Sequence, residues 1–254
     1  MVAVSRIESR LLEALKSCGP KPDDAKPQST KKNFNQNVSD ALAIALASEM
    51  RDRGMDGVLP RPRDPKTGRS TGTERRMAGG IGAKKVDVTW ATDEAGLIAA
   101  ISVKTILFRD GKTLNYQKNL TNRRADMLNE AVTLHRRFPY AVLIGFFVLD
   151  IGAASDNTPR RDSTFHNTSP RLRLFTGRTD PASREEQYEK FYVLLADFSP
   201  TQRSIHAFEV NDLEREVPLD EVFEALIERV AERNFDSYEA FDDDEGFRAL
   251  RKSS

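Results

Sequence analysis

Two side chains that could act together in a reaction, Asp87 and Lys104, lie in two short runs that alternate between apolar and polar residues. The runs, 84–90 and 99–108, are rich in β-branched and aromatic residues, and the segment 93–96 between them has the composition of a turn. Alternation with period two on both sides of a turn is typical of a β-hairpin. The sequence therefore predicts two paired strands that carry an acid and a base.

The register of this hairpin decides which side chains meet. If the turn is centred on 93–96, Asp87 lies opposite Ser102, and Asp87, Ser102 and Lys104 share one face because side chains two residues apart point the same way. Three valines are expected to point into the core instead, Val86, Val88 and Val103. A lysine on the inner side of a sheet is costly unless it is paired or used, which is a physical reason to expect chemistry here.

These residues resemble the motif of the PD-(D/E)xK nuclease family. Val86-Asp87 matches the first half of the motif and Ser102-Val103-Lys104 the second, with residues 88–101 as the spacer. Ser102 departs from the pattern, because the family usually carries Asp or Glu there. A subgroup of restriction endonucleases shares this Ser-x-Lys departure and supplies the missing acid from the following helix, in a run resembling Asn-x-Arg…Glu-Ala. In this chain that run is 122–131, which makes Glu130 the candidate second acid.

The resemblance covers about residues 38–150 and implies an α/β fold with a restriction-endonuclease-like core, a central mixed β-sheet flanked by helices. It also implies hydrolysis of a phosphodiester with Mg²⁺, for which Mn²⁺ would substitute. Asp87 and Glu130 would hold the ion through hard oxygen ligands. Lys104 would position or help activate the attacking water and offset charge in the transition state. Ser102 would hydrogen-bond Lys104 or a metal-bound water.

Two of the carboxylates have ordinary alternative roles. Glu49 lies late on a helix expected at 40–53, and enzymes of this family often place an auxiliary acid on their first helix, near the metal. An acid on a helix surface is more often simply solvated, which is the alternative for Glu49. Glu130 borders the apolar stripe of its helix, so it either faces the sheet or is a flanking residue paired with Arg123 or Arg137.

Basic and acidic residues are segregated along the chain although its net charge is zero. Basic residues predominate from 51 to 85, and acidic residues predominate from 184 to 254. The segment 54–82 is rich in Pro, Gly and Arg, too irregular for a regular element, and is a candidate binding loop for a phosphate backbone. A solvated basic loop is the alternative. The candidate nucleic-acid-binding residues are Arg61, Arg63, Lys66, Arg69, Arg75, Arg76, Lys84 and Lys85.

The remaining elements are expected from periodicity and length. Helices are predicted at 5–17, 40–53 (capped by Ser39), 121–137 and 219–235, with a partly helical segment at 163–177. Strands are predicted at 140–149, 191–198 and 204–210. The nearly continuous apolar run 140–149 indicates a strand buried on both faces beside a parallel neighbour.

We expect one main domain with appendages. Residues 1–33 would form an N-terminal helix and linker, and 34–254 a nuclease-like domain. Within that domain, 151–236 would add C-terminal strands and a helix to the core, and 237–254 would be an acidic, solvated tail.

Composition excludes several other classes. With 39% hydrophobic and 31% charged residues, no apolar run of membrane-spanning length and no signal-peptide core, the chain is expected to be cytoplasmic and to have no membrane partner. A single cysteine, Cys18, excludes an intramolecular disulfide and a cysteine-based zinc cluster. His135, His166 and His206 show no metal-ligand spacing, and no Gly-x-Ser-x-Gly motif supports acyl transfer.

The function expected from the sequence is a Mg²⁺-dependent DNA endonuclease resembling type II restriction enzymes, acting as a homodimer so that two sites cut two strands. An antiviral defence nuclease on DNA or RNA, licensed by a partner, is a second hypothesis. Under the first hypothesis, a methyltransferase is a possible partner protein. The third is a non-catalytic nucleic-acid-binding protein on a degenerate nuclease fold, for which Ser102 is the main argument.

Overall fold

A computed structural model describes residues 5–62, 64, 75–80 and 82–253, with only the backbone at 75, 76, 78 and 79. Its centre is a six-stranded mixed β-sheet of order β3-β4-β5-β6-β7-β8. The strands are β3 (Val88–Thr92), β4 (Gly96–Ile106), β5 (Val142–Asp150), β6 (Lys190–Asp197), β7 (Ser204–Glu209) and β8 (Asp212–Glu216). β4, β5 and β6 are parallel, and the other neighbours are antiparallel.

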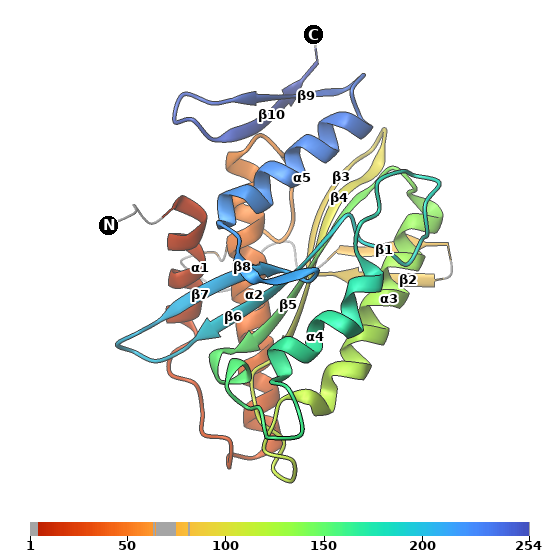
Figure 1. Ribbon diagram of the computed structural model, residues 1–254. Coiled ribbons are helices and arrows are strands. Elements are labelled where there is room, and N and C mark those ends of the chain that lie inside the picture. The colour runs from red at the N-terminus through yellow and green to blue at the C-terminus, as the bar shows by residue number, and fades with distance from the viewer. Residues whose placement is uncertain (1–4, 63, 65–74, 81, 254) are drawn as a thin grey trace.

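Helices cover both faces of this sheet (Figure 1). One core cluster joins the sheet to α1 (Arg6–Ser17), α2 (Gln28–Asp52) and α5 (Leu219–Arg233), and a second joins it to α3 (Leu120–Arg137) and α4 (Thr164–Leu172). Single-turn 3₁₀ helices span Gln117–Asn119, Ile151–Ala154 and Arg173–Phe175. The predicted α/β class, with a mixed sheet between helices, is confirmed.

β5 is the central strand, and its residues are buried along its whole length. Val142, Ile144 and Phe146 belong to one core cluster, whereas Leu143 and Phe147 belong to the other. The chain reaches β5 from β4 through α3, the crossover that a parallel pair requires. The predicted hairpin, helix and doubly buried strand therefore follow one another as expected.

The predicted hairpin is β3 and β4, and the pairing of Val88 with Ile101 sets Asp87 level with Ser102. Val86, Val88 and Val103 are buried, as predicted, but they enter different parts of the core, because Val86 packs in the α3 cluster and the other two pack in the α1–α2 cluster. The reason is a bend at Asp87, where the chain leaves the central sheet for a separate two-stranded sheet.

This second sheet pairs β1 (Arg75–Gly79) with β2 (Gly82–Val86) in antiparallel fashion. The prediction that 54–82 is entirely irregular is therefore wrong for its last residues. Much of that loop, residues 63 and 65–74, lies outside the described residues.

The N-terminal segment is part of the core. Ile7, Leu11 and Leu15 of α1 are fully buried in the main cluster, so α1 is not the predicted appendage. α2 begins at Gln28 rather than near residue 40, with Phe34 and Val38 buried, and Ser39 lies inside it instead of capping it. The predicted linker is thus limited to the residues between the two helices.

The predicted acidic tail is also structured. β9 (Tyr238–Asp242) and β10 (Arg248–Lys252) form a hairpin whose turn contains Gly246 at φ 82°. Ala249 and Leu250 are buried, and Leu250 donates its backbone N–H to the carbonyl oxygen of Arg53 at 2.8 Å. That approach requires Gly54, because a Cβ there would lie 1.9 Å from the Leu250 oxygen.

Among the described residues, no helix is both long enough and apolar enough to cross a membrane.

Candidate active site

Three elements bring Asp87, Lys104 and Glu130 together. Asp87 lies at the bend before β3, Lys104 in the second half of β4, and Glu130 in α3. Met127 and Leu134 are buried in the cluster between α3 and the sheet, one turn before and one turn after Glu130. Since residues three and four apart share a face of a helix, these two anchors turn Glu130 towards β4.

One nitrogen contacts both carboxylates. Nζ of Lys104 lies 3.2 Å from Oδ2 of Asp87 and 3.6 Å from Oε2 of Glu130. The Asp87 carboxylate also accepts the backbone N–H of Val103 at 2.7 Å. Glu130 is 3% exposed, and the side chains of Lys104 and Asp87 are 16% and 13% exposed. The two predicted acids therefore converge on a single cationic position at the rim of the core.

Ser102, the departure from the nuclease motif, holds the second acid in place. Its hydroxyl donates a hydrogen bond to Oε1 of Glu130. Tyr188, just before β6, donates to the carbonyl oxygen of Met127 at 2.9 Å and lies 3.4 Å from the Ser102 hydroxyl. In the part of the chain that the structure describes, neither Arg123 nor Arg137 forms an ion pair with Glu130, and Arg123 lies 3.8 Å from Asp126 instead.

Burial and charge shift the pKa values in opposite senses. Burial raises the pKa of Glu130, although the Lys104 charge and the Ser102 hydrogen bond oppose that shift. Burial lowers the pKa of Lys104, but Glu130 and Asp87 outweigh it, so the pKa of Lys104 is raised overall. Burial raises the pKa of Tyr188 well above its ordinary value, so its hydroxyl remains a donor. Lys104 is consequently a permanent cation at neutral pH.

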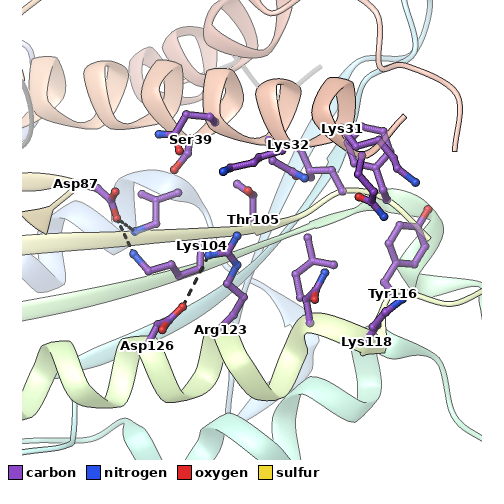
Figure 2. A pocket seen from close by; sticks show the side chains of 18 of the residues that line it. Lys31, Lys32, Ser39, Asp87, Lys104, Thr105, Tyr116, Lys118, Arg123 and Asp126 are labelled. Atoms are coloured by element: carbon purple, nitrogen blue, oxygen red, sulfur yellow. Dashed lines mark hydrogen bonds and ion pairs between the residues drawn. The ribbon is translucent and has the colours of Figure 1, made fainter. Parts of the chain in front are cut away.

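A groove of about 760 Å³ begins at these residues and continues between α2 and α3 (Figure 2). Its cationic lining residues are Lys31, Lys32, Lys84, Lys85, Lys104, Arg109, Lys118 and Arg123, and its anionic ones are Asp87, Asp110, Asp126 and Glu130. The groove is thus basic although the chain as a whole is neutral. A basic cleft attracts polyanions.

Comparisons with known protein families, curated proteins and solved structures found no match. The chemistry of the site is therefore interpreted from its own geometry.

The donor set at Asp87 and Glu130 fits a hard divalent cation. Both offer carboxylate oxygens within 3.6 Å of one cationic nitrogen, so both already face a positive charge. Among the described residues, no three His, Cys, Asp or Glu side chains gather into a metal-binding group. Mg²⁺ commonly takes only one or two carboxylates and keeps several waters, so a pair of acids meets its preference.

Glu49, the predicted auxiliary acid, lies elsewhere. It is fully buried between α1 and α2, where Arg6, Arg10 and Arg53 contact its carboxylate at 2.9, 2.8 and 2.7 Å. The prediction that Glu49 helps to hold the metal is therefore wrong. Its oxygens are occupied by three guanidinium groups, and it does not line the groove.

The predicted nucleic-acid contacts are only partly described. Lys84 and Lys85 line the groove, and Arg61 is exposed outside it. Arg63, Lys66 and Arg69 lie outside the described residues, and Arg75 and Arg76 are described by backbone alone, in β1. Sequence reasoning missed the cations of α2 and of the 117–123 segment, whose alignment in space depends on the fold.

The histidines and the cysteine lie away from this site. Nδ1 of His135 is 3.0 Å from the Glu185 carbonyl oxygen, His206 contacts Glu216, and His166 contacts Ser163. The Cys18 thiol donates a hydrogen bond to the carbonyl oxygen of Ala14.

Proposed function

We propose that this protein is a divalent-metal-dependent endonuclease that hydrolyses phosphodiester bonds of DNA. The observation that supports the proposal is the convergence of Asp87 and Glu130 on Lys104 at one end of a basic groove. A buried ammonium group is either paired or used in a reaction, and here the paired group opens onto a groove that attracts polyanions.

Each residue has a role that follows from its surroundings. Asp87 and Glu130 would hold Mg²⁺, with Mn²⁺ as a substitute, because both present hard oxygen donors to the same space. When bound, the ion would supply polarisation of the scissile phosphate and a more acidic water. Lys104, with its raised pKa, is suited to orient the attacking water and to offset negative charge on the phosphorus oxygens, rather than to remove a proton.

Ser102 is the argument for the alternative, a protein that binds nucleic acid without cutting it. Its hydrogen bond to Glu130 favours catalysis instead, because the Glu130 carboxylate, which comes from α3, lies beside position 102 and would replace the acid that this position lacks. Ser102 then acts as a positioning residue for that acid.

The proposal extends to a homodimer, since cutting both strands of a duplex needs two sites that a two-fold axis relates. In this proposal the dimer acts in the cytoplasm, in restriction or in antiviral defence. A partner-licensed nuclease and a methyltransferase partner are the other forms that the same site allows.

The test is cleavage of supercoiled plasmid in Mg²⁺ by the wild type, Lys104→Ala and the control Lys252→Ala, which removes an exposed lysine from the distant β10. We expect Lys104→Ala to lose about 10²–10³-fold in rate and Lys252→Ala to match the wild type. Thermal unfolding checks that both variants fold.

The pattern of products separates the hypotheses. Discrete bands support a sequence-reading endonuclease, and progressive degradation supports a nuclease with little sequence preference. DNA binding by the wild type without any cleavage, or full activity in Lys104→Ala, would overturn the assignment of this site.

A further inference from the structure

The groove follows an open edge of the central sheet. β3 pairs with β4 only as far as Ile101, so in the described part of the chain no strand covers Ser102–Ile106 on that side. The backbone N–H of Val103 points to this edge, where it donates to Asp87. Because a strand repeats every two residues, the main chain of Thr105 faces the same way, into the groove that Thr105 lines.

Two cations reach this edge from opposite walls. Figure 2 shows Lys32 on α2 and Arg123 on α3 extending towards the space beside Thr105. Lys32 is exposed and contacts no carboxylate among the described residues, and Arg123 has only a loose, solvated ion pair with Asp126 at 3.8 Å. Lys104 and Arg123 line the same groove, and the charge of Arg123 opposes the rise in the pKa of Lys104.

We propose that the groove between α2 and α3 carries the phosphodiester strand that Lys104 acts on, and that Lys32 and Arg123 bind the phosphates next to the scissile one. This inference rests on the proposed function and adds the path of the substrate. The strand would lie along the β4 edge, with the Thr105 backbone N–H as a third phosphate donor.

The lining favours a nucleic acid over an acidic peptide. Besides the cations, α2 presents Asn35, Gln36 and Ser39 to the groove, and amide side chains can read base edges. The acidic lining residues Asp110 and Asp126 contact Lys118 and Arg123, so an incoming phosphate would compete for these pairs. Phosphates of a DNA strand form a regular series of anions, which matches cations distributed along a groove.

The test is the salt dependence of DNA binding. A fluorescein-labelled duplex oligonucleotide is titrated with the double variant Lys32→Ala/Arg123→Ala, by anisotropy, in Ca²⁺ with a check that the DNA stays uncut, and again in EDTA. The matched control is Lys252→Ala/Arg124→Ala, which removes the same charges. Arg124 neighbours Arg123 on α3 but stacks over Phe175 and does not line the groove.

We expect the slope of log K against log salt to fall in magnitude by about two in the groove variant, because each lost phosphate contact removes close to one unit. The control should keep the wild-type slope. An unchanged slope in the groove variant, absence of DNA binding by the wild type in both buffers, or equal displacement of the DNA by polyglutamate would overturn the proposal.

The two proposals fail in different ways. Plasmid cleavage by the wild type together with an unchanged slope would reject this path while the nuclease survives. A reduced slope in the groove variant, together with a wild type that never cuts, would keep the path and reject the nuclease.

Discussion

Replacing Ser102 by Ala is expected to destabilise the protein through one buried carboxylate. Ser102 is 2% exposed and donates to Glu130, whose side chain is 5% exposed. A hydrogen bond to a charged group contributes about 1.5–3 kcal/mol. Ser102→Ala should therefore lower the free energy of unfolding by about 2 kcal/mol at neutral pH, where an ionised Glu130 would lose that donor.

The matched control is Thr89→Val, which removes another buried hydroxyl. Oγ1 of Thr89 has no hydrogen-bond partner among the described residues, so its loss should leave stability unchanged or raise it. Urea titrations of both variants and the wild type give the two free energies, and constant m-values show that they are comparable.

The pH dependence sharpens this prediction. The Ser102 hydrogen bond lowers the pKa of Glu130 and so opposes the upward shift from burial. Its removal raises that pKa further, so the cost of Ser102→Ala should shrink as the pH falls and Glu130 takes up a proton. An equal cost at every pH, or no cost at neutral pH, would refute the assigned role of Ser102.

Two further predictions concern the other acids. Because burial raises the pKa of Glu130, the stability that this group contributes in acid is lost as the pH rises through its folded-state pKa. In metal-free buffer the free energy of unfolding of Glu130→Gln should therefore increase relative to that of the wild type as the pH rises. The same variant should lose cleavage. Glu49→Gln should lower stability by about 3 kcal/mol, since it leaves Arg53 with less compensation in the core. Calorimetry measures the stability of both variants, and plasmid cleavage below the melting range measures their activity. Normal cleavage by Glu130→Gln, or impaired cleavage by a folded Glu49→Gln, would contradict these predictions.

Local periodicity predicted the elements that build the site. Alternation specified the β3–β4 hairpin, and the helical spacing of Met127 and Leu134 set Glu130 at the border of the apolar stripe of α3, from which it could face the sheet. The bend at Asp87 was not predictable, because Val86 and Val88 continue the alternation without interruption although they enter different core clusters.

Elements with little apolar content were missed for a physical reason. The first turns of α2 are polar, and their buried positions include Lys31, whose ammonium group lies 5.9 Å from the Phe108 ring centroid. In the C-terminal hairpin, Ala249 and Leu250 supply the buried apolar residues of β10, and the acidic turn suggested a tail. Tyr188 gave no signal, since its partners Met127 and Ser102 are brought to it only by the packing of α3 on the sheet.

The arginine cluster around the buried Glu49 ties together segments that lie far apart in the sequence. Arg6 contacts Glu245 across 239 positions, and Arg53 donates to the Arg248 carbonyl oxygen across 195. Contacts of such long range close very large loops and form slowly. During synthesis on the ribosome, α1 and the end of α2 are made long before the β9–β10 hairpin, so this part of the core is complete only after that hairpin has been made and has folded against them.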